Sequence, residues 1–265
     1  MALIAMAVYS SKENKKDECL ERTLGSLSKT VDFSKHQLVL SINGRTEETD
    51  NIISYYQTDT ISRGIISEVI YNDSNLGTAE AVNKVIRLRK QNQHVIKMDD
   101  DVVIHQDGWV DEMEEAIRRD NKIGIIGLKR RDLIQTTWHP DPHFRSVLKM
   151  LPHEPGQKWL HVEETGDVMG TCTMYNPALL DKIGYLRQIK KYGYDDNIAC
   201  HRSHLAGFYN CFLTGIDIEH IDNGGTPYQD WKQKHSGECT QDFIKLVHDM
   251  IAGKESIYYN PFEAK

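Results

Sequence analysis

The sequence predicts an α/β protein with a mainly parallel central sheet flanked by helices, and two observations support this. Short apolar, β-branched runs alternate with stretches of helical composition from residue 3 to residue 128. This alternation is typical of a doubly wound parallel sheet. Three of the runs end in polar or glycine-containing loops, at residues 9–11, 43–45 and 99–101. Ligands bind beyond the carboxyl ends of the strands in such sheets, so we expect these loops to share one functional edge.

The first half of the chain supplies most of the expected sheet. Apolar runs predict strands at residues 3–8, 36–42, 66–71, 94–98 and 122–128. Helices are expected between them, at residues 18–27, 46–56, 79–90 and 108–119, where the composition is helical and apolar side chains recur at helical spacing. The opening run lacks the basic flank and the cleavage site of a signal peptide, so it is interpreted as a buried strand.

The amino-acid composition changes at the start of the second half of the chain. Residues 129–164 are rich in histidine and contain four prolines, which predicts a long, irregular insertion of functional importance. A strand at 168–175 and a short helix at 177–183 are expected next, followed by a helix at 198–206. Two closing strands, at 208–214 and 216–221, and a helix at 241–251 complete the predicted order.

Composition restricts the class of protein. A chain of 265 residues suits one large domain or two closely packed halves. The formal charge of -7 argues against an extended basic surface that binds nucleic-acid phosphates. Lys129, Arg130 and Arg131 remain a contact point for a polyanionic acceptor, although such a cluster is more commonly a solvated face. Five scattered cysteines without a C-x-x-C pair indicate reduced thiols in a cytoplasmic protein, and no run approaches the ~18–20 apolar residues of a membrane span.

Asp99, Asp100 and Asp101 directly follow the strand at 94–98. Adjacent carboxylates repel one another and resist burial, so they require a compensating cation, for which a divalent metal is the leading candidate over a solvated acidic turn. Alternate residues of a strand face the same way, so we expect Asp99 and Asp101 to share a face and Asp100 to turn from it. Asp101 is then the direct metal ligand, Asp99 meets the ribose or a metal-bound water, and Asp100 tolerates Asn best.

Five motifs in order resemble those of the GT-A glycosyltransferases, and within them the family-2-like enzymes. Residues 41–49 resemble the loop usually written Asp-Asp-Gly-Ser-Thr-Asp, and residues 75–83 are similar to the Asn-x-Gly helix start. Residues 98–102 with 107–110 match the metal motif and the Gly-Trp helix behind it. Residues 170–175 resemble the acceptor-side strand, and Asp195-Asp196 with Arg202 resembles the Glu-Asp…Arg helix start.

The resemblance covers residue 3 to about residue 220, and it implies one GT-A type, Rossmann-like domain with an acceptor-side insertion. Residues 1–128 would bind the nucleotide sugar, residues 129–225 would bind the acceptor, and residues 226–265 would form a C-terminal extension. The activity implied is metal-dependent transfer of one sugar from a nucleoside-diphosphate sugar, with a UDP-sugar as the leading donor and Mn²⁺ or Mg²⁺ as the cofactor. The acceptor is open: a glycan or a lipid-linked acceptor is favoured over nucleic acid. The Gln-x-x-Arg-Trp signature of processive synthases is absent.

The resemblance also assigns roles to single residues. Asp196, supported by Asp195, would act as the base of an inverting reaction, a role favoured over that of an acidic N-cap of the helix, with which it is compatible. His220 would be a further metal ligand, with His235 in reserve, or simply a hydrogen-bonded histidine. Trp138, Trp159 and the histidines between them would form an acceptor lid or a satellite cluster.

The donor would be bound mainly by the predicted nucleotide-binding residues, which are Asn43, Arg45, Gly77, Asn83, Asp99 and Asp100. Two departures from the family pattern affect this set. Asn43 replaces the Asp that usually meets the base, and Val82 replaces a basic residue that usually precedes the helix asparagine. Plain turns around Asn43 and Gly77 are the alternative explanation.

Three other functions remain open at this point. The first is a retaining transferase of the same fold, in which Asp195 and Asp196 orient the substrate. The second is a nucleotidyltransferase, whose glycine-rich, lysine-bearing loop is missing after the first strand. The third is a non-catalytic binding module on a degenerate transferase fold, which would not need both the Asp triplet and Asp196.

Overall fold

The structure is a computed structural model that describes residues 1–58, 64–131, 146–222 and 227–263, except for a few side chains near the start of the last helix. The strands are β1 (Ala2–Tyr9), β2 (Gln37–Gly44), β3 (Ile66–Tyr71), β4 (His94–Met98), β5 (Val102–Val103), β6 (Ile123–Arg130), β7 (Val147–Met150), β8 (His161–Thr165), β9 (Cys172–Tyr175) and β10 (Tyr209–His220). The helices are α1 (Asp17–Thr30), α2 (Glu47–Thr58), α3 (Thr78–Ile86), α4 (Trp109–Arg119), α6 (Pro177–Ile183), α7 (Asp195–Leu205) and α8 (Pro227–Ile251).

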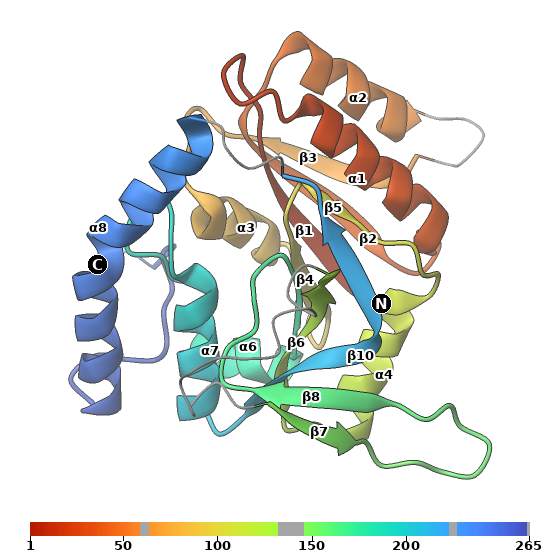
Figure 1. The fold of residues 1–265 in the computed structure, drawn as a ribbon, viewed down its shortest axis with the longest axis vertical. Coiled ribbons are helices and arrows are strands. Elements are labelled where there is room, and N and C mark those ends of the chain that lie inside the picture. Colours follow the sequence, from red (N-terminus) through yellow and green to blue (C-terminus); the bar gives the residue numbers. More distant parts are fainter. Residues whose placement is uncertain (59–63, 132–145, 223–226, 264–265) are drawn as a thin grey trace.

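One large sheet organises the described residues, with the strand order β3-β2-β1-β4-β9-β6-β10-β8-β7. Its first four strands are parallel, as the alternating pattern predicts. β9 runs antiparallel to both β4 and β6, and β8 and β7 continue the sheet in antiparallel fashion. The fold class predicted from the sequence, an α/β sheet flanked by helices, is confirmed (Figure 1).

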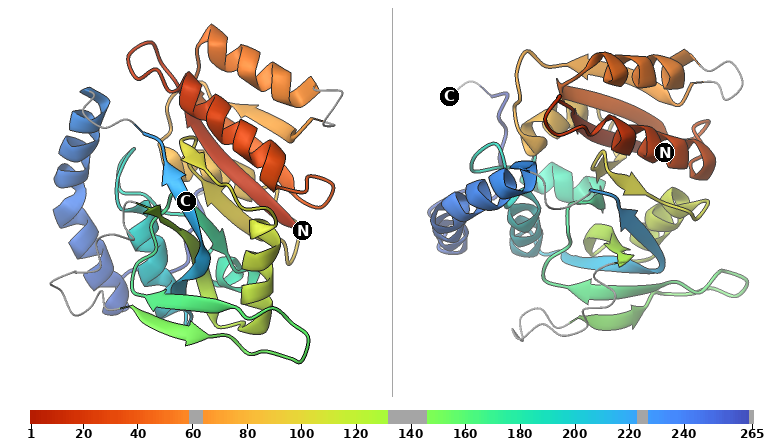
Figure 2. Two further views of the ribbon diagram at one scale, coloured as in Figure 1. Left: turned by 45° about the vertical axis from the view of Figure 1, so that its right-hand side comes forward. Right: turned by 45° about the horizontal axis from the view of Figure 1, so that its top comes forward.

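The helices cover both faces of this sheet, and a separate core lies on each face. In β1, Ile4 and Met6 join the core that contains the apolar side chains of α1, α2 and α4. Leu3 and Ala5, pointing to the opposite face, join the core formed with α3, α6 and α7. A strand buried on both faces has no polar alternation, which explains the continuous apolar run at the start of the sequence. α8 packs outside α7, at the edge of the molecule (Figure 2).

Several predicted elements differ in detail from the structure. The expected insertion at 129–164 contains the antiparallel pair β7 and β8, joined by a hairpin loop. The four side chains of β7 are exposed, so no apolar periodicity marked this strand. The strand expected at 168–175 is limited to β9, because residues 166–171 form a loop at the cavity described below. The helix expected at 241–251 is the second half of the longer α8.

β10 replaces the two closing strands that were expected. Its pairing with β6 shifts between Leu213 and Asp217, where Gly215 adopts a φ of +84°. Glycine takes this left-handed conformation without steric cost, so the strand can bulge and continue. The segment beyond the bulge pairs with β5, with His220 opposite Val102. The bulge thus directs the end of β10 toward the Asp triplet.

Candidate active site

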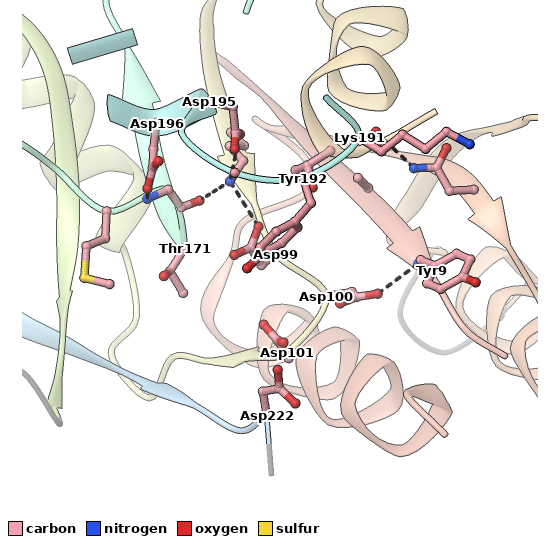
Figure 3. A pocket seen from close by; sticks show the side chains of 18 of the residues that line it. Tyr9, Asp99, Asp100, Asp101, Thr171, Lys191, Tyr192, Asp195, Asp196 and Asp222 are labelled. Atoms are coloured by element: carbon pink, nitrogen blue, oxygen red, sulfur yellow. Dashed lines mark hydrogen bonds and ion pairs between the residues drawn. The ribbon is translucent and has the colours of Figure 1, made fainter. Parts of the chain in front are cut away.

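A cavity of about 560 Å³ opens beyond the carboxyl ends of β1 and β4. This is within the range of roughly 300–1,000 Å³ that ligand sites commonly occupy. Its lining includes six carboxylates, which belong to Asp99, Asp100, Asp101, Asp195, Asp196 and Asp222. Figure 3 shows Asp195 and Asp196 at one side of the cavity, with Asp101 and Asp222 apart from them. So many carboxylates in one cavity require positive charge from the protein or from a ligand.

The Asp triplet lies in a turn, because β4 ends at Met98. Its three side chains diverge. Asp99 Oδ1 lies 3.2 Å from Lys97 Nζ, and Asp100 Oδ2 accepts a hydrogen bond from the backbone N–H of Tyr9 at 3.2 Å. All three residues line the cavity, and the strand alternation from which the orientation of Asp100 was predicted ends before the triplet. Burial and the charge of Asp101 raise the pKa of Asp100 to about 7.

Asp101 belongs to a compact cluster of possible metal ligands with His220 and Asp222. One ligand atom from each of these three residues lies within 4.8 Å of the others. The pairing of β10 with β5 positions them, supported by a hydrogen bond of 2.9 Å from the Ile221 N–H to the Asp101 carbonyl. His220 Nε2 is 3.4 Å from Asp101 Oδ1. His220 was predicted as a ligand, whereas Asp222 was not.

The donor set of this cluster fits a hard divalent cation. Two carboxylates and an imidazole are ligands that Mn²⁺ accepts, and Mg²⁺ also prefers the carboxylates. Asp101 Oδ1 is buried and has no well-aligned hydrogen-bond donor among the described residues. Burial alone would raise the pKa of Asp101, but His220 and Lys16 together hold it below its ordinary value. The carboxylate is therefore ionised and ready to bind a cation at neutral pH.

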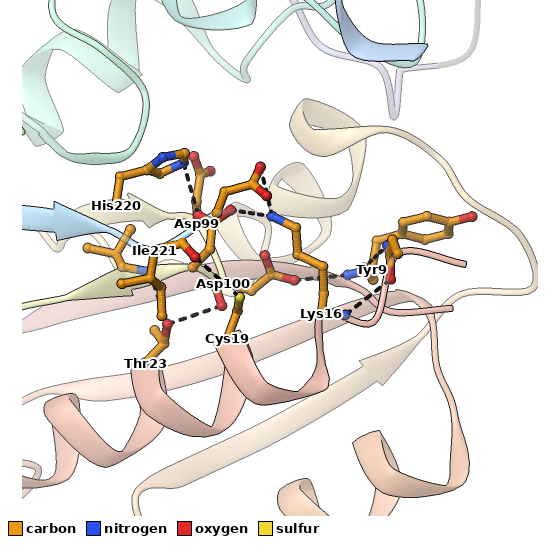
Figure 4. Close-up of polar contacts among 12 residues, drawn as sticks. Tyr9, Lys16, Cys19, Thr23, Asp99, Asp100, His220 and Ile221 are labelled. Carbon is orange, nitrogen blue, oxygen red and sulfur yellow. Dashed lines mark hydrogen bonds and ion pairs between the residues drawn. The ribbon is translucent and has the colours of Figure 1, made fainter. Parts of the chain in front are cut away.

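Lys16 supplies the first of two buried ammonium groups in the cavity. It directly precedes α1, and its Nζ forms an ion pair with Asp101 and lies 3.2 Å from Asp222 Oδ2. The Lys16 side chain is only 6% exposed. Figure 4 shows it extending from the start of α1 toward the Asp triplet. The ammonium therefore contacts two of the three candidate metal ligands.

Lys97, the second buried ammonium group, links the Asp triplet to the Asp195–Asp196 pair. Its Nζ donates a hydrogen bond of 2.7 Å to the Gly170 carbonyl and lies 3.8 Å from Asp195 Oδ2. Burial by itself would lower the pKa of Lys97, but Asp99 and Asp195 raise it above its ordinary value. Lys97 is consequently a permanent cation beneath the cavity.

Asp195 and Asp196 are the first two residues of α7. Two left-handed residues precede them, Gly193 with a φ of +104° and Tyr194 with a φ of +63°. This turn directs both carboxylates into the cavity, where the helix dipole favours negative charge. Asp196 Oδ2 accepts a hydrogen bond of 3.0 Å from the Gly170 N–H. Burial raises the pKa of Asp195 to about 6.

Only part of the predicted nucleotide-binding set lines the cavity. Asn43 and Gly77 do so, and the Asn43 side chain donates to the Gly77 carbonyl at 3.1 Å. Arg45 lies outside the lining, where it pairs with Asp50 at 3.0 Å. Asn83 is also absent from the lining, because its side-chain amide donates to and accepts from the backbone of residue 186. Nucleotide binding by Arg45 and Asn83 stays a prediction, since neither residue lines the cavity.

Most of the other predicted groups lie outside the cavity lining. Trp159 is 55% exposed, stacks on His153 and does not line the cavity, whereas Trp138 falls outside the described residues. Within the basic cluster at 129–131, Arg130 lines the cavity, whereas Lys129 pairs with Glu163 and Arg131 pairs with two carboxylates of β10. The reserve ligand His235 is on α8 and is not part of the lining. All five cysteines are free thiols, as expected.

Sequence reasoning missed four charged residues of the cavity lining, which are Lys16, Lys97, Lys191 and Asp222. Asp222 follows His220 by two positions and Lys97 precedes Asp99 by two, so each carried a weak signal in the alternation along a strand. Lys16 lies in a polar loop with no periodic pattern, and its proximity to Asp101 arises from tertiary folding alone. None of the described helices is long and apolar enough to cross a membrane.

Comparisons with solved structures identify proteins of the same fold. A mannosyltransferase of Pyrobaculum calidifontis, in complex with GDP-Man and Mn²⁺, superposes with a TM-score of 0.69 at 13% identity, over 94% of this chain and 64% of that one. Residues 1–349 of Staphylococcus aureus TarS, in complex with UDP-GlcNAc, give a TM-score of 0.57 at 15% identity, over 87% and 63% of the two chains. GalNAc-T7 with UDP, GalNAc and Mn²⁺ gives 0.60 at 14%, over 83% and 44%.

These likenesses show the GT-A fold, and the chain spans less than two thirds of each of those structures. A comparison with curated protein sequences gives no match. The sequence profile of the family described as "Glycosyl transferase family 2" matches residues 4–184, which is more than half of the chain. The match covers the parallel strands, the Asp triplet and β9. The chain therefore belongs to glycosyl transferase family 2.

Proposed function

We propose that this protein transfers one sugar from a nucleoside-diphosphate sugar to an acceptor, with a divalent metal ion as cofactor and with inversion at the anomeric carbon. One observation carries the proposal most directly. The possible metal ligands Asp101, His220 and Asp222 and the carboxylate pair Asp195–Asp196 line one cavity in a family-2 fold. A metal ion held by the first group could contact the leaving group of the donor, and the carboxylate pair could face the reacting carbon from another side of the cavity.

The metal ion, when bound, would neutralise the diphosphate leaving group as a Lewis acid. Asp101, His220 and Asp222 would hold it, with Asp99 close enough to meet a metal-bound water or the ribose. Asp100 and Asn43 line the side of the cavity near Tyr9 and Gly77, which we assign to the nucleoside. The parallel half of the sheet, residues 1–128, would then bind the donor, and residues 129–225 would bind the acceptor.

Asp196 is the proposed base that removes the proton from the acceptor hydroxyl. The Gly170 N–H fixes Asp196 Oδ2, and the Asn197 N–H donates to Oδ1 at 2.9 Å, so the carboxylate has a defined orientation. Asp195, the neighbouring carboxylate at the start of α7, lines the same cavity and would support it. General base catalysis contributes roughly 10²–10⁴-fold to such rates.

Turnover with UDP- and GDP-sugars in the presence of Mn²⁺, followed by NMR of the product, tests this proposal. We expect release of the nucleoside diphosphate and a product with the opposite anomeric configuration from the donor. Asp196→Asn should lower kcat by roughly 10²–10⁴-fold with little change in the donor KM. A product with the configuration of the donor would remove the base role of Asp196 and indicate a retaining enzyme.

A further inference from the structure

Tyr194 has an uncommon backbone conformation directly before the Asp195–Asp196 pair. Its φ of +63° lies in the left-handed region, where a bulky side chain is strained. Such a conformation persists only when the surrounding contacts hold the residue in place. The contacts that hold Tyr194 therefore also set the direction in which Asp195 and Asp196 leave the turn.

Both the ring and the hydroxyl of Tyr194 contact α8. The ring stacks on the Phe243 ring, with the two centroids 4.4 Å apart and the planes 8° from parallel. The hydroxyl shares a hydrogen bond of 2.9 Å with Thr240 Oγ1. Thr240 and Phe243 are three positions apart, so they lie on the same face of α8. Two contacts with one helix face fix both the place and the rotation of the Tyr194 side chain.

α8 also contacts the segments on either side of Tyr194. Cys239 Sγ donates a weak hydrogen bond of 3.7 Å to the carbonyl of Tyr192, a residue that lines the cavity. Farther along α7, the His201 ring lies with its centroid 5.9 Å from that of Phe243. α8 thus packs against the turn and the helix that follows it (Figure 1).

The other end of α7 is anchored independently of α8. The buried Arg202 guanidinium donates to the backbone carbonyls of residues 183, 185 and 257. These bonds fix the second half of α7 and leave the position of its first turn to the contacts of Tyr194. Asp195 and Asp196 belong to that first turn.

We propose that α8 positions the carboxylates of the proposed reaction: Phe243 and Thr240 hold Tyr194 in its left-handed conformation and thereby direct Asp195 and Asp196 into the cavity. The inference rests on the proposed role of Asp196 and assigns Phe243 and Thr240 as positioning residues. Without the contacts from α8, Tyr194 relaxes to an unstrained conformation and the peptide planes after it rotate.

The displacement affects one part of the site and spares another. Asp196 Oδ2 accepts a hydrogen bond of 3.0 Å from the Gly170 N–H, and rotation of the turn moves the carboxylate away from this donor. The possible metal ligand His220 is held by the pairing of β10 with β5, which α8 does not form. Loss of the α8 contacts should therefore slow the chemical step and leave metal binding intact.

The first experiment compares wild type with Phe243→Ala in steady-state turnover. Ile244→Ala is the matched control, because Ile244 is the next residue of α8 and its side chain is 40% exposed. We expect Phe243→Ala to lower kcat by about 10²-fold, the typical cost of displacing a catalytic group by about 1 Å. The donor KM should change by less than about threefold, and Ile244→Ala should match wild type. Phe243→Tyr keeps the stacked ring and should restore most of kcat.

A double-mutant cycle shows whether Tyr194 and Phe243 act as one unit. Tyr194→Gly accepts the left-handed φ without steric cost and loses both contacts with α8. It should lower kcat by about as much as Phe243→Ala, and the double variant should be no slower than the slower single variant. Losses that multiply in the double variant would overturn the proposal, because the two residues would then act independently.

A milder variant covers the case in which Phe243→Ala does not fold. Tyr194→Phe keeps the ring and removes only the hydroxyl that bonds to Thr240. It should lower kcat about fivefold, as expected for the loss of one neutral hydrogen bond. An unchanged kcat would overturn the role of Thr240.

The other results are equally decisive. Unchanged kcat in Phe243→Ala, or an equal loss in Ile244→Ala, overturns the positioning role. Weaker binding of Mn²⁺ by Phe243→Ala in calorimetry would place the effect at the metal ligands and also overturn it.

Hydrogen exchange with mass-spectrometric readout tests the contacts from α8 without turnover. We expect the amides of residues 194–198 to exchange faster in Phe243→Ala than in wild type or Ile244→Ala, because the turn opens locally. Equal exchange in all three proteins would overturn the proposal. Failure of wild type to turn over any nucleotide sugar contradicts the proposed function, whereas the exchange measurement still tests whether α8 holds the turn.

Discussion

Replacement of Lys97 by Met tests whether Lys97 acts as the counter-ion of Asp99 and Asp195. Lys97 Nζ is 3.2 Å from Asp99 Oδ1 and 3.8 Å from Asp195 Oδ2, and it donates a hydrogen bond to the Gly170 carbonyl. Its side chain is 5% exposed. Met fills a similar volume without the charge. The substitution therefore leaves two partly buried carboxylates without their common counter-ion and one carbonyl without its donor.

The size of the effect follows from these contacts. Removing one partner of a buried ion pair destabilises a protein by about 3–5 kcal/mol. We therefore expect Lys97→Met to lower the free energy of unfolding by about 4 kcal/mol at pH 7.5. Burial already raises the pKa of Asp195 to about 6 and raises that of Asp99, and both pKa values rise further without Lys97.

The sign of the pH dependence follows from these raised values. A carboxyl group with a folded-state pKa above its unfolded value of 3.8 favours folding at low pH, and this contribution is lost as the pH rises through the folded-state pKa. At pH 5, below the pKa of about 6 for Asp195, the Asp195 carboxyl of Lys97→Met is mostly protonated and tolerates burial, and the raised pKa of Asp99 acts in the same direction. The difference in unfolding free energy between wild type and variant should therefore shrink to about 1–2 kcal/mol, the cost of the unpaired carbonyl.

Urea denaturation at pH 7.5 and pH 5 measures both differences. Lys182→Met is the matched control, because Lys182 is exposed and its Nζ donates to a backbone carbonyl, that of Ala206, at 3.0 Å. The control should lose less than about 1 kcal/mol at either pH. An equal loss at both pH values for Lys97→Met, or a larger loss at pH 5, would refute the counter-ion role.

Three further substitutions separate binding from stability. Asp101→Asn should abolish metal-dependent nucleotide affinity in calorimetry. Asp100→Asn should keep most of that affinity, because an amide oxygen can still accept a hydrogen bond from the Tyr9 N–H. The reverse order of effects would show that the ligand assignment is wrong. Gly77→Ala should cost about 1–3 kcal/mol in urea denaturation, because Gly77 has a φ of +88° and an added Cβ would lie 2.5 Å from a backbone oxygen. Gly108→Ala, with a φ of +72° and open space around the Cβ, should lose only the backbone part, so equal losses would argue against the clash. Arg202→Met should make the C-terminal segment more susceptible to cleavage in limited proteolysis, because the buried Arg202 guanidinium donates to three backbone carbonyls, including that of residue 257. A segment that stays protected in the variant would contradict the anchoring role of Arg202.

The parallel half of the fold is predictable from the sequence because each of its strands is a short apolar run, followed by a helix with its own apolar stripe. β1 and β4 are examples, since burial on both faces removes polar residues from them. β7 could not be found, because its side chains are exposed and only pairing with β8 defines it. The long β10 was divided in two by the polar residues around its bulge at Gly215.

The candidate site was also predictable only in part. The Asp triplet and the Asp195–Asp196 pair are consecutive carboxylates, so the sequence displays them directly. Lys16 and Asp222 meet only because β10 pairs with β5 and because Lys16 precedes α1 at the same edge, and neither contact has a local pattern. The orientation predicted for Asp100 assumed strand alternation, which ends with β4 at Met98, before the triplet.

Calorimetry with UDP- and GDP-sugars, each with and without Mn²⁺, tests the central claim most directly. Six carboxylates outnumber the four basic residues that line the cavity, so we expect an anionic donor to bind there together with a metal ion. We expect measurable affinity for at least one nucleotide sugar with Mn²⁺ and a loss of that affinity when the metal is removed by a chelator. Binding of a sugar chain without any metal-dependent nucleotide affinity would contradict the claim and identify a non-catalytic binding module.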